Sequence, residues 1–409
     1  GKINLDLFNL FFICVVMSGS VEGATYYVST QGDDANDGLN ERSAWRTISH
    51  AAKVAKAGDT VLVLPGDYGD EQVVFANSGE KGKPIVFKGH KGRPRLKSAD
   101  PKAVAFLAEG KSYIHIEGFD IIGYGSAVVL TYCAFCRVRD LRCLGRGGGI
   151  VLRDGTDYCW VDGCYVEDTY WNGIAIYGDS YYRLRPCSFN VISNCTVVRG
   201  GHSSIDVHTC CPDTYVVGCV VRERGKDRKG RTATCGLYFH NHHIDRLHSI
   251  GNIAYDVHWG TFLGGGVNCV IADNLLFNVS KGIDFDYERI RMKGSRGLER
   301  VDAPCDRNII AENIIFNVSK APPIWMCGAR HNLICRNYAD GGQDLPDYEC
   351  HRCAGVEPIG NRIVDPMRGG ERINVREGYF SVSLSPGFGP SGIGYRLRGA
   401  GKTQQILGG

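Results

Sequence analysis

Short stretches of alternating apolar and polar residues recur along the chain from about Tyr113 onward. Seven of them begin at a turn residue and read GIVLRD, GIAIYG, SIDVHT, GLYFHN, GTFLGG, GIDFDY and PIWMCG. Side chains of a strand alternate between its two faces, so the first and third residues after each turn residue point the same way. These residues are almost all aliphatic, which predicts seven strands that each bury one face.

A second group of nine apolar stretches, from IHIEGFDII to NLICRNYA, recurs at spacings of about 21 to 39 residues between the members of the first group. Two strands per repeat with glycine turns predict a parallel β-solenoid, in which each coil buries its apolar side against its neighbours. Asparagines recur at one point of these stretches and predict a hydrogen-bonded ladder: Asn252, Asn274, Asn313 and Asn337. Cysteines at the adjacent position predict either an interior thiol stack or disulfides: Cys143, Cys164, Cys195 and Cys219.

The N-terminal sequence TYYVSTQGDDANDGLNERSAWRTISHAAKVAKAGDTVLVLPGDY, followed by GKPIVFKG, resembles the entry region of secreted proteins of the pectate-lyase-like superfamily. The likeness to this superfamily, and to its polysaccharide lyase families nine and six, implies an all-β, right-handed parallel β-helix with an N-terminal capping helix. Residues 44–57 form an amphipathic pattern that suits this cap. We expect the β-helix with its cap over residues 24–345 and a C-terminal closing segment and tail over 346–409, because DPMRGGERINVREGYFSVSLSPGFGPSGIG resembles the closing segment of the family.

The first 23 residues have the pattern of a secretory signal peptide, with Lys2, a short apolar run and small residues up to Gly23. We therefore expect a secreted protein, extracellular or periplasmic. No later apolar run reaches the length that spans a membrane, so we expect no stable membrane insertion. The 18 cysteines agree with an oxidising compartment and predict disulfide bonds.

The second and fourth residues after each turn residue should point outward, and they carry unusual side chains. In coil order they are Val151 and Arg153, Ala175 and Tyr177, Asp206 and His208, Tyr238 and His240, Phe262 and Gly264, Asp284 and Asp286, Trp325 and Cys327. Neighbouring coils lie about 4.8 Å apart, so this order places Arg153, Tyr177, His208 and His240 in one column. Aromatic, acidic and basic side chains together on one face predict a ligand groove, with Phe262 and Trp325 as flat surfaces for sugars.

The repeat is lengthened at residues 177–187, 222–232 and 286–300, and these insertions are rich in arginine and lysine. Long loops on a rigid scaffold often border a functional site, so we expect Arg183, Arg222, Arg289 and Arg291 to bind substrate. The chain has 47 basic against 44 acidic residues and a net charge of +3. Basic insertions on a chain of such small net charge favour a local anionic ligand. We expect an anionic polysaccharide or oligosaccharide, no nucleic acid, and a monomer.

Two chemistries fit these residues. In β-elimination from a uronate polymer, His208 or His240 would be the base, Tyr177 or Tyr238 the acid, and Arg153 or the arginines of the insertions would neutralise the sugar carboxylate. Asp206, Asp284 and Asp286 could then hold Ca²⁺. An inverting glycoside hydrolase would instead pair Asp284 with Asp286, roughly 7 Å apart along one strand.

A non-catalytic polysaccharide-binding or surface β-helix protein is a further alternative. In the two lyase families that the sequence resembles, a calcium site accompanies a lysine base or a lysine and an arginine. No lysine occupies a groove position here, since Lys281 lies at a turn, so neither catalytic set carries over residue by residue.

Overall fold

The computed structural model describes residues 23–339 except 146, 179–184, 233, 242–243, 287, 295–296, 304, 328 and 330, and beyond 339 the course of several strands. Side chains between 287 and 304, and those beyond 339, lie outside the described residues. The predicted leader, Arg183, and the side chains of Arg289 and Arg291 fall in these parts.

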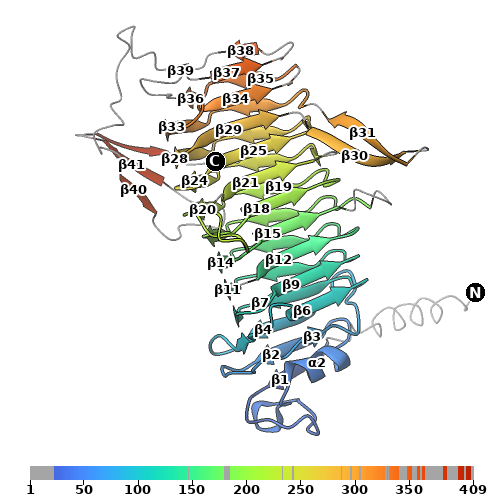
Figure 1. The fold of residues 1–409 in the computed structure, drawn as a ribbon. Coiled ribbons are helices and arrows are strands. Elements are labelled where there is room, and N and C mark those ends of the chain that lie inside the picture. Colours follow the sequence, from blue (N-terminus) through green and yellow to red (C-terminus); the bar gives the residue numbers. More distant parts are fainter. Residues whose placement is uncertain are drawn as a thin grey trace, which may run out of the picture.

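Three long parallel sheets, of 13, 11 and 11 strands, run the length of the molecule (Figure 1). Sheet A consists of β1 (Thr25–Val28), β2 (Thr60–Val63), β4 (Ile85–Gly89), β7 (Ile114–Glu117), β10 (Arg137–Arg139), β13 (Trp160–Asp162), β16 (Val191–Ser193), β19 (Tyr215–Val217), β23 (His248–Ile250), β27 (Val270–Ala272), β32 (Ile309–Ala311), β35 (Leu333–Cys335) and β38 (Glu357–Ile359). Sheet B consists of β5 (Arg95–Lys97), β8 (Asp120–Ile122), β11 (Arg142–Leu144), β14 (Tyr165–Glu167), β17 (Thr196–Val198), β20 (Val220–Arg222), β24 (Ile253–Tyr255), β28 (Leu275–Val279), β33 (Ile314–Val318), β36 (Tyr338–Ala339) and β39 (Arg362–Ile363). Sheet C consists of β3 (Val73–Val74), β6 (Val104–Glu109), β9 (Ser126–Thr131), β12 (Gly148–Arg153), β15 (Asn172–Tyr177), β18 (Ser203–His208), β21 (Cys235–His240), β25 (Trp259–Gly264), β29 (Lys281–Asp286), β34 (Ile324–Cys327) and β37 (Tyr348–His351).

Each coil contributes one strand to each sheet, so the prediction of two strands per repeat is wrong. Every stretch of the second sequence group is divided into a sheet A and a sheet B strand by one residue with φ between 48° and 78°. These residues are Gly118, Asp140, Gly163, Asn194, Gly218, Gly251, Asp273, Glu312 and Arg336. A left-handed residue turns the chain sharply, and because most of these positions are not glycine, the turn is hidden in the apolar pattern. The sheets also continue past the predicted boundary at residue 345, through β37, β38 and β39.

The inward face of sheet C is the aliphatic stack that the alternation predicts. Ile150, Ile174, Ile205 and Leu237 lie in register on successive strands and are each 0% exposed. Burying a side chain of this size stabilises the fold by about 1.5 to 3 kcal/mol, so the column holds consecutive coils together.

The predicted asparagine ladder is confirmed at the turn between sheets A and B. The backbone N–H groups of Asn252, Asn274 and Asn313 each donate to the side-chain oxygen of the next asparagine, at 2.9, 3.0 and 2.9 Å, ending at Asn337. These side chains satisfy buried turn amides that water cannot reach.

The cysteine column continues this ladder toward the N-terminus. The N–H of Cys219 donates to Asn252 Oδ1 at 2.8 Å, and Cys195 and Cys164 precede it in register. All three are buried free thiols, so the stack of interior thiols, and not a set of disulfides, is present at this position. Cys143 is also a free thiol, but it lies in strand β11 opposite Val166 and not in the column.

The N-terminal cap is a helix, α2 (Ile48–Val54), shorter than the predicted 44–57. Trp45 is extended and bridges to Val28 of β1, and the Thr47 side chain caps the helix by accepting from the His50 N–H. Ile48 of the helix joins the solenoid core, and Figure 1 shows α2 beside β1 and β3 at the first coils. A short 3₁₀ turn, η1 (Glu41–Ser43), precedes it.

Smaller elements lie at the edges of the solenoid. A pair of short strands, β22 (Ile244–Asp245) and β26 (Gly266–Val267), follows sheet C strands. The insertion after β29 is a hairpin of β30 (Glu288–Gly294) and β31 (Gly297–Ala303), which projects from the side of the solenoid in Figure 1. The C-terminal residues form a three-stranded sheet of β40 (Ser381–Leu384), β41 (Tyr395–Gly399) and β42 (Lys402–Ile406). Within the described residues, no helix has the length and apolar character needed to span a membrane.

Candidate active site on the outer face of sheet C

The register of sheet C places the predicted outward residues as the alternation requires. Arg153 pairs with Tyr177, Tyr177 with His208, and His208 with His240. The second outward row runs in parallel through Asp206, Tyr238, Phe262, Asp284 and Trp325. The insertions at 178–186 and 287–304 follow the carboxyl ends of β15 and β29, whereas that at 223–234 leads into the amino end of β21.

Asp206 is the centre of one cluster on this face, which we call the Asp206 cluster and which consists of Asn172, Tyr177, Ser203, Asp206 and His240. The Asp206 side chain is 2% exposed although it belongs to the outward row, because its neighbours cover it. Its Oδ2 accepts from Asn172 Nδ2 at 2.7 Å and from Ser203 Oγ at 3.2 Å, and its Oδ1 lies 3.3 Å from His240 Nε2. Asn172 also contacts the Tyr177 hydroxyl.

The charges of this cluster favour an ionised Asp206. Burial alone would raise the pKa of the Asp206 carboxyl. The interactions with His240, and more weakly with His208 and His202, outweigh burial, so the pKa of Asp206 lies below its ordinary value. Burial and the Asp206 charge raise the pKa of Tyr177 well above the usual range for a phenol. A protonated Tyr177 and a carboxylate-bound His240 therefore lie on either side of one buried anion.

The two histidines of the column differ in their partners. His208 Nε2 contacts Asn241 Nδ2 at 2.6 Å and its Nδ1 contacts Thr209 Oγ1 at 3.0 Å, so both ring nitrogens are engaged. His240 Nε2 lies 3.3 Å from Asp206 Oδ1, so this edge of the ring faces the buried carboxylate. The rings lie 4.3 Å apart, centroid to centroid, at 74°. Of the two predicted bases, His240 therefore has the arrangement that a general base needs.

Asp284 is the centre of a second cluster three rungs further on, with Trp259 and Lys281. Its side chain is also 2% exposed, and its Oδ2 accepts from Trp259 Nε1 at 3.0 Å and from Lys281 Nζ at 2.8 Å. Its Oδ1 is buried without a hydrogen-bond partner in the described structure. Lys281 is the first residue of β29, so the prediction that this lysine stays at a turn, away from the groove, is wrong.

The remaining predicted residues are distributed more widely. Tyr238 stacks on His240 at 4.0 Å and lies 5.0 Å from Phe262, so these three rings form one aromatic patch. Trp325 and Asp286 are half-buried on the same face, in register with Asp284 and Gly264 respectively. Arg153 is exposed, and its Nε donates to Thr131 at 3.1 Å and lies 3.7 Å from Asp154.

Arg222 does not reach this face. It ends β20 in sheet B and forms an ion pair with Glu223. Arg222 was predicted from the basic insertion at 222–232, and the insertion begins only after this residue, which ends a strand of sheet B. For Arg183, Arg289 and Arg291 the side chains lie outside the described residues.

The three aspartates do not fit a shared calcium ion. Ca²⁺ takes six to eight oxygen ligands within about 2.6 Å, but Asp206 and Asp284 lie three rungs, about 14 Å, apart. Their oxygens accept from an amide, a hydroxyl, an indole and an ammonium group, which are donors and not metal ligands. Among the residues that the structure describes, no group of three His, Cys, Asp or Glu side chains is arranged to hold a metal.

Sequence reasoning missed the partners of both carboxylates, which share one column at the beginning of the sheet C strands. Asn172, Ser203, Cys235, Trp259 and Lys281 pair in register there. These residues lie on or beside the turn residues, and the alternation of side chains along a strand does not predict which face such residues occupy. The signal was present in the alignment of the strands, since each column residue stands three positions before the first outward residue of its strand.

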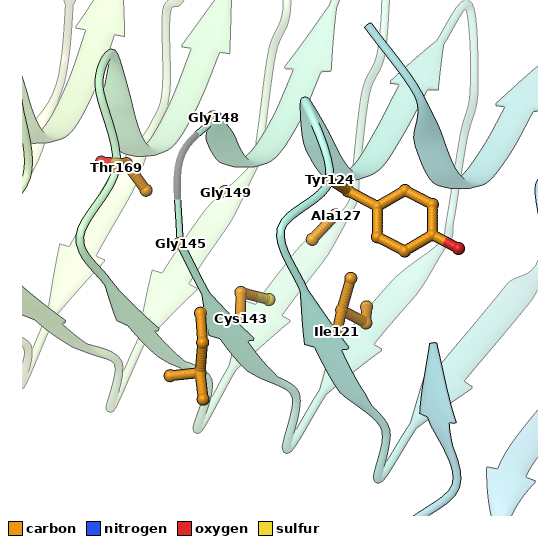
Figure 2. A pocket seen from close by; sticks show the side chains of 9 residues that line it. Ile121, Tyr124, Ala127, Cys143, Gly145, Gly148, Gly149 and Thr169 are labelled. Atoms are coloured by element: carbon orange, nitrogen blue, oxygen red, sulfur yellow. The ribbon is translucent and has the colours of Figure 1, made fainter. Parts of the chain in front are cut away.

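A small pocket near the first coils is a separate feature. Figure 2 shows its lining, which includes Ile121, Tyr124, Cys143, Gly149 and Thr169 from neighbouring coils. The Tyr124 hydroxyl beside it donates to the Glu71 carbonyl at 2.7 Å. The pocket contains none of the predicted site residues, so the candidate site remains the open face of sheet C.

Comparison with known proteins agrees with this architecture. The family model of the right handed beta helix region matches residues 98–244, which include the whole Asp206 cluster. The fold is a right-handed parallel β-helix. A curated relative, the uncharacterized protein YwoF of Bacillus subtilis (strain 168), is 37% identical over 83 residues. These residues make up 20% of this chain and 17% of that protein, so the match spans a small part of both.

Solved structures with the same β-helix include lyases and hydrolases of carbohydrates. A rhamnogalacturonan lyase superposes with a TM-score of 0.59 at 18% identity, covering 89% of this chain and 91% of its own. A GH136 lacto-N-biosidase from Eubacterium ramulus gives a TM-score of 0.57 at 14% identity, covering 87% of this chain and 70% of its own. Likeness at these identities establishes the fold, and the chemistry has to be argued from the site.

Proposed function

We propose that this protein is a secreted enzyme that cleaves an anionic, uronate-containing polysaccharide by β-elimination on the outer face of sheet C. The observation that carries the proposal is the buried Asp206 carboxylate, which contacts His240 directly and Tyr177 through Asn172. A base and an acid held by one anion are the two groups that this elimination requires.

In the proposed reaction, His240 removes the proton from C5 of the uronate. In this proposal Asp206, whose Oδ1 lies 3.3 Å from His240 Nε2, stabilises the imidazolium that forms, as a buried carboxylate does beside a catalytic histidine. The electron pair of the broken C5–H bond forms the C4=C5 double bond, and the C4–O4 bond breaks.

Tyr177 donates its proton to the departing O4. Its raised pKa keeps the phenol protonated before the reaction, and its neighbour His208 fixes its ring at a centroid distance of 5.5 Å. Removal of the C5 proton also requires positive charge beside the sugar carboxylate. We assign this role to Arg153, one rung from Tyr177, and to the arginines of the insertions at 178–186 and 287–304.

The hydrolase alternative receives less support from the site. Asp284 is held by Lys281 and Trp259 and is 2% exposed, so it is poorly placed to activate water as an inverting base. Asp286 is half-buried on the same face, and the glycosidase with this fold keeps hydrolysis as the second candidate.

The test is a panel of uronate polymers, each compared with its carboxyl-reduced form. A lyase produces new reducing ends together with the ultraviolet absorbance of an unsaturated uronate, and acts only on the acidic form. Reducing ends without this absorbance would replace the lyase by a hydrolase. Binding without any product would replace the enzyme by a polysaccharide-binding protein.

The same activity assay in the presence of a chelator tests the predicted binding of Ca²⁺. Because the aspartates of this face do not fit a shared ion, we expect the purified protein to keep its activity in the chelator. Loss of activity that added Ca²⁺ restores would show that calcium binds with the substrate.

Sequencing of the mature N-terminus from culture supernatant tests export and cleavage near Gly23.

A further inference from the structure

Three successive turns stack at the amino edge of sheet C and bring positive residues together. The N–H groups of Ser280 and Lys281 both donate to the His258 carbonyl at 3.0 Å, and the Lys320 N–H donates to the Ser280 carbonyl at 2.9 Å. His258 immediately precedes β25, and Ser280 immediately precedes β29. The backbone itself therefore fixes the spacing of these turns.

Arg224 joins this edge from the insertion between β20 and β21. Its Nη2 donates to Ser280 Oγ at 3.1 Å, and Ser280 is 0% exposed. The hydrogen bond to this buried hydroxyl thus holds the exposed Arg224 guanidinium at the edge of the groove.

The positive charges at this edge exceed the negative ones. Asp284 offsets Lys281, but the ion pairs found among the described residues include neither Arg224 nor Lys320. Burial lowers the pKa of His258, and the charges of Lys320, Arg224 and Lys281 lower it further. The three cations therefore all lie close enough to His258 to act on it.

Trp259 gives this edge an aromatic ring. Its Nε1 is fixed by Asp284 at 3.0 Å, its ring centroid lies 4.4 Å from that of His258, and the Lys281 ammonium lies 5.4 Å from the ring centroid. The ring is half-buried and lies 6.3 Å from Phe262 in the groove. An indole beside several cations suits a sugar unit that carries an acidic group.

We propose that Arg224, Lys281 and Lys320, together with Trp259, form a separate subsite that binds the carboxylate of a second uronate unit of the same polysaccharide. The inference rests on the proposed function, since it takes the reaction centre to be the Asp206 cluster. Asp284 lies three rungs, about 14 Å, from Asp206, so the subsite holds a different sugar unit from the one that reacts. The subsite then makes cleavage depend on chain length and on charge at that unit.

The experiment compares Lys320→Ala and Arg224→Gln with Lys97→Ala, a control that removes one positive charge from β5 on sheet B, at the opposite end of the solenoid. Binding of an acidic polysaccharide and of its carboxyl-reduced form is measured by calorimetry for each protein. We expect each subsite variant to bind the acidic polymer roughly tenfold more weakly, as the loss of one charged hydrogen bond implies, without change for the reduced polymer. For a cleaved substrate, the same loss appears in KM.

Equal weakening by Lys97→Ala would overturn the subsite, because the effect would then come from the overall charge. A loss confined to a sulfated polymer without carboxylates would also overturn it, since the anion recognised would be a sulfate ester. The binding measurement needs no turnover. If no polymer is cleaved, the proposed lyase reaction fails, while selective loss of binding to the acidic polymer still supports the subsite.

Discussion

Asp206 and Asp284 occupy the same position in coils three rungs apart, and both are 2% exposed, yet their surroundings differ. Asp206 is held by an amide and a hydroxyl and faces the imidazole of a histidine. Asp284 is held by an indole and an ammonium group. One backbone position therefore carries a carboxylate beside a histidine in one coil and a carboxylate paired with a lysine in another.

The difference arises from the column at the beginning of the sheet C strands. In this column, Asn172 and Ser203 are the residues on the strand before Asp206 and on the strand of Asp206 itself. Trp259 and Lys281 have the same two places relative to Asp284. Because a solenoid repeats its backbone, a change of one side chain in a coil changes the chemistry without changing the scaffold.

The largest expected effect separates the two aspartates by catalysis. Asp206→Asn should lower kcat by about 10²- to 10⁴-fold, because an amide can donate to His240 and hold the wrong tautomer of its ring. Asp284→Asn should act mainly on KM. Both constants are measured from the absorbance of the unsaturated product. Equal losses of kcat in the two variants would remove the distinction between the clusters.

The next effect concerns stability. Lys281→Met should destabilise the fold by about 2 kcal/mol, since it leaves the Asp284 carboxylate buried without its ion pair, although Lys281 itself is partly exposed. The double variant Lys281→Met with Asp284→Asn should recover much of this loss. Denaturant unfolding measures all three proteins. A single variant as stable as the parent would show that the pair contributes nothing.

A smaller effect is expected in acid. The folded-state pKa of Asp206 is lowered, so the stability from its ionised form is present above the unfolded value of about 3.9 and is lost as the pH falls through the folded value. Below about pH 4, the unfolding temperature of the parent protein should therefore fall more steeply than that of Asp206→Asn. Parallel curves in this range would contradict the lowered pKa.

The smallest effect is an expected absence of change. Cys164, Cys195 and Cys219 are buried free thiols, and burial with neighbouring thiols raises the pKa of Cys195 well above its usual value. A reducing agent should leave the unfolding temperature unchanged, and a thiol reagent should label these cysteines only after unfolding. A large fall in unfolding temperature on reduction would show that disulfides stabilise the protein.

The sequence predicted the features that depend on strict alternation. The inward stack of Ile150 to Leu237 and the outward column of Tyr177, His208 and His240 follow from one side chain per strand position. The asparagine ladder follows from the recurrence of one residue type at the same point of each repeat. It did not predict the third sheet, because residues such as Asp140 and Glu312 adopt left-handed turns that only local backbone geometry reveals. Lys281 was missed for a related reason, since a residue at a strand boundary has no assigned face.

The sequence also did not predict that the outward aspartates are buried. Alternation places Asp206 and Asp284 on the solvent side, but large neighbours on adjacent rungs cover both of them. The coverage comes from residues 3 to 34 positions away in sequence, such as Lys281, Trp259 and Asn172. Packing across coils therefore decides which polar groups are buried, and with it the difference between the two clusters.

The comparison of His240→Ala with His208→Ala tests the central claim most directly. Both variants remove an imidazole from the same column, but His240 Nε2 lies 3.3 Å from Asp206 Oδ1, whereas His208 contacts Asn241 and Thr209 through its two ring nitrogens. Initial rates of unsaturated product formation should fall by about 10²- to 10⁴-fold for His240→Ala and by much less for His208→Ala. Retention of the parent rate by His240→Ala, with the fold intact, would contradict the assignment of the Asp206 cluster as the reaction centre.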